Sequence, residues 1–198
     1  MYDVHPMIVC RMGKKSKAGD NLVQIQLLTE LKQSMLQEIP RAVKEFKLSN
    51  GDEVCYISLL GTNYEPLLGL ITLGIKSCRD EMLQEGSIDK LWKSGAMPCQ
   101  YQIGLEKLPV SFAEKQEQFV DLHRNGDQWE DACDVCRQIR CEVAYQLNGL
   151  NWSTTIPVTD DFVVYSEWEA IDVKNGDLER SIPKDKLSLL KERGLLLN

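Results

Sequence analysis

The sequence predicts an α+β fold in which an antiparallel or mixed sheet packs against several helices as a single pair of layers. Two strand-like segments, 54–60 and 67–73, follow each other closely, and a third occurs late, at 162–168. Long segments with helical periodicity surround them. With 198 residues, of which 43% are hydrophobic and 27% charged, the chain is long enough to bury a sizeable core.

The N-terminal region is predicted to form an arm or short strand over residues 1–19, followed by a single α+β domain over 20–198. The polar stretch Gly19-Asp20-Asn21 offers a helix N-cap. Apolar residues then recur at helical spacing over 22–46, which predicts a long helix. Pro40 is expected to kink or divide that helix, because its ring removes a backbone donor.

The next segment predicts a β-hairpin. Ser49-Asn50-Gly51-Asp52 is a turn signal, and the residues from Val54 to Leu60 favour a strand. A connection over 61–66 leads to a second strand over 67–73. We expect the two strands to pair antiparallel.

The middle of the chain is predicted to be mainly helical. Ser77-Cys78-Arg79-Asp80 resembles a capping box, with Asp in the place of Glu, and opens a helix that reaches Gln84. A short helical piece over 88–92, a strand over 99–105 and a helix over 111–124 are expected to follow.

The last third predicts two helices and a strand. The helix over 127–147 begins with the acids of a capping box, and Asn148-Gly149 ends it. The strand over 162–168 is followed by a turn at Asn175-Gly176. The final helix covers 183–193, and its first residue is a proline, which costs least in a first turn.

Composition favours a cytoplasmic protein. The longest apolar runs have the length of a strand, so no membrane segment is expected, and the first residues lack a secretory signal. The seven cysteines are an odd number, and without export we expect them to be reduced. No Gly-rich phosphate loop follows a strand, and no cofactor site is predicted.

The most metal-like pattern is Cys133-x-x-Cys136-x4-Cys141, with His123 upstream. Tetrahedral zinc needs converging ligands, whereas Cys141 lies about 140° around the helix from Cys136. We therefore favour buried thiols over a metal site. A catalytic Cys–His pair that uses His123 stays open, as does an enzyme with a cleft around His123 and either Cys99 or Asp161.

The net charge of −7 is concentrated in one segment. Residues 127–180 hold twelve acids and four bases, whereas the rest of the chain is close to neutral. This argues against nucleic acid as a ligand of the acidic segment, because phosphates repel carboxylates. A basic protein partner is the better expectation.

Four of these acids share one helix face. Asp127, Glu130, Asp131 and Asp134 fall at i, i+3, i+4 and i+7. Acids in a first turn offset the positive end of the helix dipole, so the cluster can be merely a solvated face. As a binding surface, it would speed the encounter with a basic partner.

The stretch Thr159-Asp160-Asp161 is interpreted first as the start of a strand, where such side chains bond backbone N–H groups. On an alternating strand the acids also share one side, and the other side is mostly apolar. This pattern predicts a strand with one side in contact with water, able to hold a partner. The residues on the predicted wet side are Asp161, Val163, Tyr165, Glu167 and Glu169.

The leading hypothesis is a non-enzymatic factor that binds a basic protein partner. The alternatives are a hydrolase or other small enzyme around His123, and a structural subunit of a larger assembly. The oligomeric state is not readable from the sequence. The predicted binding surface consists of Asp127, Glu130, Asp131, Asp134, Asp160, Asp161, Tyr165, Glu167 and Glu169.

The C-terminal part carries a resemblance. Asn-Trp-Ser at 151–153, Pro-Val-Thr-Asp-Asp-Phe-Val-Val-Tyr at 157–165 and Leu-Lys-Glu-Arg-Gly-Leu-Leu at 190–196 resemble small bacterial proteins that contain domains of unknown function. Some of those proteins are encoded beside toxins as immunity factors. The resemblance implies a similar protein-binding role and transfers no catalytic residue.

Overall fold

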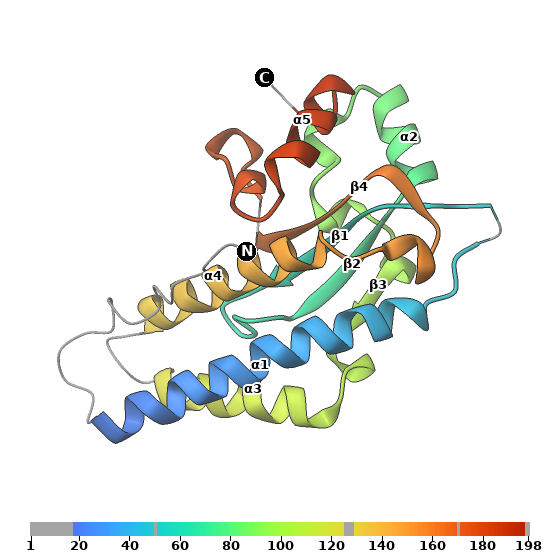
Figure 1. The fold of residues 1–198 in the computed structure, drawn as a ribbon. Coiled ribbons are helices and arrows are strands. Elements are labelled where there is room, and N and C mark those ends of the chain that lie inside the picture. The colour runs from blue at the N-terminus through green and yellow to red at the C-terminus, as the bar shows by residue number, and fades with distance from the viewer. Residues whose placement is uncertain (1–17, 50, 125–128, 170, 197–198) are drawn as a thin grey trace.

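The structure, a computed structural model, describes residues 18–49, 51–124, 129–169 and 171–196 (Figure 1). The predicted N-terminal arm therefore falls almost entirely outside the described residues. The described residues form five α-helices, one four-stranded mixed sheet and several single-turn 3-10 helices. The predicted α+β class is confirmed.

The sheet has the strand order β3-β2-β1-β4. Strands β1 (Val54–Gly61) and β2 (Leu70–Ile75) are antiparallel, which confirms the predicted hairpin. The short β3 (Gln102–Gly104) pairs with β2, and β4 (Val158–Trp168) pairs in parallel with β1. β-Branched and aromatic residues are frequent in β1, β2 and β4, since such side chains pack well on a pleated surface.

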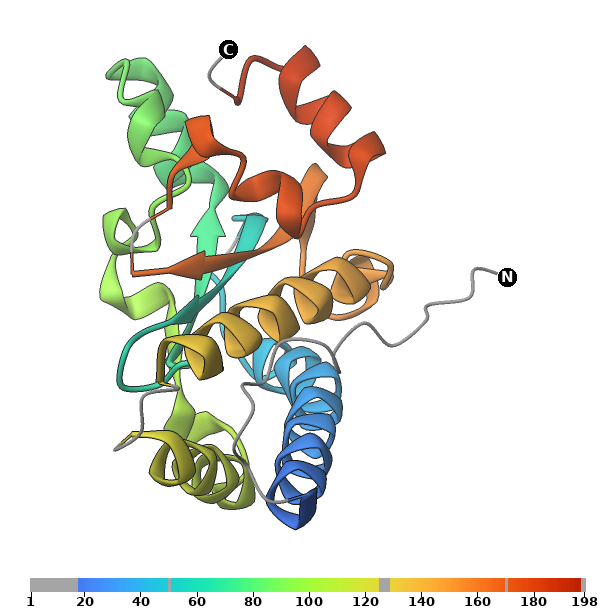
Figure 2. The same cartoon turned by 90° about the vertical axis from the view of Figure 1, so that its left-hand side faces the viewer.

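Three helices cover one face of the sheet: α1 (Ala18–Lys44), α3 (Val110–His123) and α4 (Trp129–Leu147) (Figures 1 and 2). Helix α1 packs against both α3 and α4, and α4 lies on β4. The buried side chains of α1 recur at helical spacing, so one stripe of the helix enters the main core. This stripe includes Leu28, Leu31, Met35 and Ile39.

The other face of the sheet is also covered. Helix α2 (Lys76–Gln84), helix α5 (Lys184–Glu192) and the segments 88–97 and 171–182 lie over it (Figures 1 and 2). A second apolar cluster fills the space between them and the sheet. The structure thus adds a third layer to the single pair of layers that the sequence predicts.

Two local predictions differ from the structure. Pro40 does not divide α1, since the helix continues to Lys44 and the neighbouring Ile39 and Val43 are fully buried in the core. The capping box predicted at Ser77 is wrong. Helix α2 begins one residue earlier, and the Ser77 hydroxyl donates to Asp52 instead.

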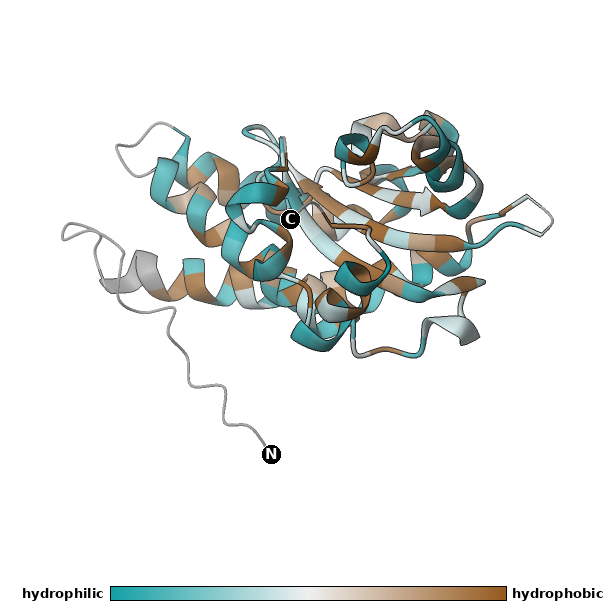
Figure 3. Ribbon diagram, turned by 90° about the horizontal axis from the view of Figure 1, so that it is seen from above, coloured by the Kyte–Doolittle hydropathy of each residue, from teal (hydrophilic) through white to brown (hydrophobic). Residues whose placement is uncertain are grey.

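Hydrophilic and hydrophobic residues alternate around the helices, as expected of helices with one face in a core (Figure 3). None of the helices in the described part of the chain is both long enough and apolar enough to cross a bilayer.

Candidate functional site

A surface depression follows the outer side of helix α4. Its central pocket has a volume of about 1010 Å³ and shares residues with a smaller pocket at each end, of about 220 Å³ and about 230 Å³. We call these three adjoining pockets the α4 groove. The central pocket is lined by Lys32, Asp134, Arg137, Gln138, Cys141, Glu142, Tyr145, Gln146 and Arg180.

The spacing of residues on α4 explains this lining. Positions 134, 137, 138, 141 and 145 follow the i, i+3, i+4 pattern, so they form one stripe along the helix. The opposite stripe, which includes Cys136 and Val143, is fully buried against the main core. The groove is completed by Lys32 from α1 and by Arg180 from the 3-10 helix Leu178–Arg180.

The charged residues of the groove are paired with one another. Arg137 contacts Asp134 at 2.8 Å, and Lys32 contacts Glu142 at 2.6 Å. A third pair, Arg180–Asp177, has an N···O distance of 3.7 Å. The lining therefore carries balanced charge and is not part of a continuous anionic surface.

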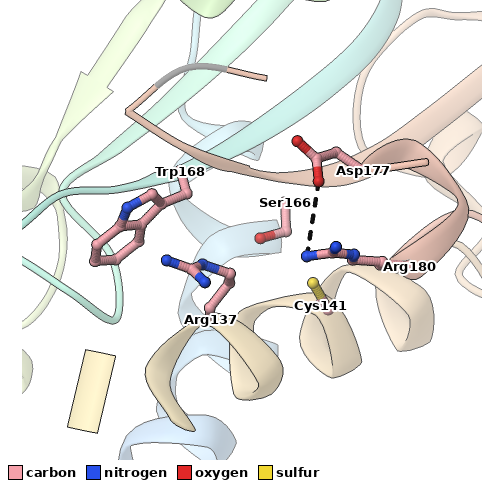
Figure 4. A pocket seen from close by; sticks show the side chains of 6 residues that line it. All are labelled: Arg137, Cys141, Ser166, Trp168, Asp177 and Arg180. Atoms are coloured by element: carbon pink, nitrogen blue, oxygen red, sulfur yellow. Dashed lines mark ion pairs between the residues drawn. The ribbon is translucent and has the colours of Figure 1, made fainter. Parts of the chain in front are cut away.

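One end of the groove is richer in positive charge. This end, which we call the Trp168 pocket, is lined by Arg137, Cys141, Ser166, Trp168, Asp177 and Arg180 (Figure 4). The guanidinium carbon of Arg137 lies 4.7 Å from the centre of the Trp168 ring. This cation–π contact holds the Arg137 side chain at the pocket wall.

A buried arginine lies behind this wall. Arg140 has no exposed surface, its Nε donates to Ser166 Oγ at 2.9 Å, and its Nη1 donates to the carbonyl of Pro66 at 2.5 Å. Nη2 has no hydrogen-bond partner among the described residues. Burial lowers the pKa of Arg140 to about 10. Position 61 must be glycine here, because a Cβ would collide with the guanidinium.

The acids predicted on the helix have different surroundings. Glu130, Asp131 and Asp134 are exposed on α4, as expected, and Asp134 is the one that pairs with Arg137. Asp127 lies outside the described residues. Glu130 and Asp131 form no ion pair with any described residue.

The acids at the start of β4 are neutralised by arginines. Asp160 is exposed and forms an ion pair with Arg193, and Asp161 is buried between Arg193 and Arg79. Burial opposes ionisation of Asp161, but the Thr159 hydroxyl and Arg79 outweigh it and lower the Asp161 pKa. Residues 159–161 lie at the start of β4, as predicted, but their side chains contact arginines and one another, and these contacts argue against a combined anionic surface.

The predicted wet side of β4 is wrong for four of its five residues. Asp161, Val163, Tyr165 and Glu167 are each at most 3% exposed, because helix α2 and the segments 88–97 and 171–196 cover this side of the strand. The Tyr165 hydroxyl donates to the Trp92 carbonyl at 2.7 Å.

Glu167, near the end of β4, and Glu169, just beyond it, differ in exposure. Glu167 is held by the Ser58 hydroxyl at 2.7 Å and by the Ser94 N–H, and burial nevertheless raises its pKa. Glu169 alone of the predicted wet side is exposed, and it accepts a hydrogen bond from the Asn63 side chain.

The surroundings of His123 among the described residues do not support the proposed cleft. His123 is buried, its Nδ1 lies 2.7 Å from the Phe119 carbonyl of its own helix, and its ring packs on Phe119. It lines none of the pockets of the α4 groove. Asp161 is bound to Arg79 and Arg193 elsewhere in the molecule.

The cysteine pattern forms no metal cluster within the described residues. Cys133 and Cys136 are buried, which confirms the expectation of buried thiols, and burial raises the pKa of both. Cys141 is half-buried and faces the Trp168 pocket, a position that the sequence did not reveal (Figure 4).

No family model, curated protein or solved structure matches the chain. Function is therefore inferred from geometry alone. The sequence analysis missed four residues of this site, which come from three elements. These are Arg137 and Arg140 on α4, Trp168 on β4 and Arg180 on the 3-10 helix. A signal was present for Arg140, since its position falls within the apolar stripe of α4, and a buried arginine is uncommon.

Proposed function

We propose that the protein binds another protein through the α4 groove. The observation that supports this proposal is the row of three adjoining pockets in the α4 groove, of which the central one has a volume of about 1010 Å³. Tyr145, which lines it, is 57% exposed. Tyrosine and arginine are enriched at protein interfaces, because both combine apolar area with directed hydrogen bonds.

The electrostatics of the groove suit a partner that covers it. Three ion pairs, made by Arg137, Lys32 and Arg180, already balance the charge of the lining. A partner therefore needs no opposite net charge to cover the groove. Beyond it, Glu130 and Asp131 offer an attractive contact for basic residues of the partner.

The kind of partner follows from the length of the groove. The pockets extend from Ile25 on α1 to Trp168 at the end of β4, so they fit a segment of chain better than a small molecule. An immunity-type role, in which the partner is a basic toxin, is one form of this proposal.

Site-specific photo-cross-linking tests the groove directly. A photoreactive phenylalanine analogue replaces Tyr145 in the groove or, as the matched control, Tyr64, which is 82% exposed on the β1–β2 connection. In cells that naturally make the protein, position 145 should capture one defined partner, identified by mass spectrometry, and position 64 should not.

The other outcomes of the cross-linking experiment also decide between the proposals. Equal capture at both positions, or none at 145, would contradict the proposal. Capture of a second copy of this chain would support the structural-subunit alternative instead.

The acidic contact is tested with the captured partner. Changing Glu130→Gln and Asp131→Asn together should lower the association rate several-fold at low salt and flatten its salt dependence. The matched control is Asp160→Asn, since Asp160 is exposed but neutralised by Arg193. If both variants had the same effect, the acids at the start of α4 would have no special role.

A further inference from the structure

We propose that the Trp168 pocket is a binding site for a phosphate group. The pocket has a volume of about 220 Å³, which suits a small oxyanion with a few waters. Its donors come from three separate elements: Arg137 from α4, Ser166 from β4 and Arg180 from the 3-10 helix that follows (Figure 4). Donors arriving from several directions match a tetrahedral phosphate better than a planar carboxylate.

Arg137 and Arg180 each have guanidinium N–H groups that are not used in the hydrogen bonds of the described residues. Arg137 uses only Nη1 for its hydrogen bond to Asp134, and the ring of Trp168 keeps the guanidinium at the wall of the pocket. Arg180 lies 3.7 Å from Asp177 and forms no hydrogen bond with it among the described residues. Its side chain is 56% exposed, so it can turn toward a bound anion without breaking a close contact.

The buried Arg140 supplies a positive charge that would favour binding of an anion in the Trp168 pocket. Its partners within hydrogen-bond distance are carbonyl and hydroxyl oxygens, so no carboxylate of the described residues neutralises it directly. Its Nε contacts Ser166, and its guanidinium carbon lies 5.4 Å from the Trp168 ring. A buried cation without a direct counter-ion is costly, and an anion bound on the other side of Ser166 offsets that cost.

The net charge of the site agrees with this ligand. Within the pocket Asp177 offsets Arg180, and Asp134 beside the pocket offsets Arg137, which leaves Arg140. The buried Glu167 interacts with Arg140 but makes no hydrogen bond to it, and burial raises the Glu167 pKa, which opposes its ionisation. A phosphate group of nearly two negative charges would recruit Arg180 and compensate Arg140 together. The inference does not need a protein partner, so it can fail or succeed independently of the proposed function.

Phosphate binding is measured on the isolated full-length chain. Inorganic phosphate, O-phosphoserine and acetate are each titrated at constant ionic strength, with the indole N–H signal of Trp168 followed by NMR and assigned with Trp168→Phe. Both phosphates should shift this signal saturably, and acetate should bind at least about tenfold more weakly. Comparable affinities for the two phosphates indicate a site for free phosphate, and preference for O-phosphoserine indicates a site for a phosphorylated side chain.

Variants locate the site. Arg137→Gln and Arg180→Gln should each weaken phosphate binding about tenfold or more. Arg41→Gln is the matched control, because Arg41 is also exposed and also pairs with an acid three residues away on a helix. Equal effects of all three variants, equal binding of acetate, or the absence of a saturable shift would overturn the proposal.

Thiol protection in the unchanged chain gives a second, independent measurement. Cys141 lines the pocket, whereas Cys99 is exposed and does not line the α4 groove. Phosphate should slow alkylation of Cys141 by at least about threefold and leave that of Cys99 unchanged. Equal rates at Cys141 with and without phosphate would contradict the site.

Discussion

The acids of helix α4 and the acids of strand β4 are the same kind of residue in two different surroundings. On α4, Glu130 and Asp131 project into solvent and form no ion pair with any described residue. On β4, Asp161 is buried between two arginines, and Glu167 is buried among hydroxyl and amide donors. Carboxylates of the same acidic segment are thus exposed on α4 and buried with hydrogen-bond or ion-pair partners on β4.

The difference lies in what covers each element. Only one side of α4 packs against the core, whereas β4 has helices on one face and the segment 171–196 on the other. A buried carboxylate requires a partner, and Asp161 has Arg79 and Arg193. Exposed acids on a helix require none, so they can be changed with little cost to the fold.

The largest effect is expected at Asp161. Asp161→Ala leaves Arg79 without its counter-ion at a largely buried site and should lower the free energy of unfolding by about 3 kcal/mol at pH 7. The control Asp131→Ala should change it by less than about 0.5 kcal/mol. Urea unfolding of both variants measures the contrast, and similar losses would show that the two acids do not differ.

The pH dependence of the same variant follows from its pKa. The pKa of Asp161 is lowered in the fold, so its contribution is complete above the ordinary value of 3.8 and is lost as the pH falls through the lower, folded value. The difference in the free energy of unfolding between the wild type and Asp161→Ala should therefore become smaller below about pH 3.8. A deficit that is constant down to acid unfolding would contradict this assignment.

A smaller effect is expected at Glu167, and its pH dependence is opposite to that of Asp161. Its pKa is raised by burial, so the carboxyl stabilises the fold fully below the ordinary value of 4.5, and this advantage is lost as the pH rises through the folded value. Glu167→Gln removes the loss of stability that accompanies ionisation of Glu167. Its free energy of unfolding should stay within about 1 kcal/mol of the wild-type value at pH 7. Unfolding curves at pH 4.5 and pH 8 test it, and a variant whose pH profile matches the wild type would contradict the raised pKa.

The smallest effect is expected at the start of α4. Glu130→Gln with Asp131→Asn removes the favourable interaction of two acids with the N-terminal end of the helix dipole, and the free energy of unfolding should fall by about 0.5 kcal/mol. High salt should remove most of this difference. A loss as large as that of Asp161→Ala would show that these acids, too, have a structural partner.

Local patterns in the sequence predicted the elements well. The hairpin of β1 and β2, the long helix α1 and helix α4 each follow from the periodicity of their own residues. Helix starts were predicted less well, as the wrong capping box at Ser77 shows. There the Ser77 hydroxyl, predicted to cap the helix, donates instead to Asp52, which is distant in the sequence.

The candidate site could not be predicted in the same way. The side chains that neutralise Asp161 come from Arg79 and Arg193, which lie far away in the sequence on opposite sides of it. No periodicity within β4 indicates that another segment will cover its second face. The Trp168 pocket was also not predictable from local patterns, because its residues come from a helix, a strand and a 3-10 helix that meet only in the folded chain.

The position of β1 in the sheet has a consequence for how the protein is made. Its parallel partner β4 follows about a hundred residues later, as the pairing of Val54 with Val158 shows. At ribosomal rates of about 5–20 residues per second, the apolar edge of β1 waits for roughly 5–20 s before β4 emerges. During that interval β1 can pair with β2 on one edge only, so the nascent chain presents the other edge to unwanted pairing.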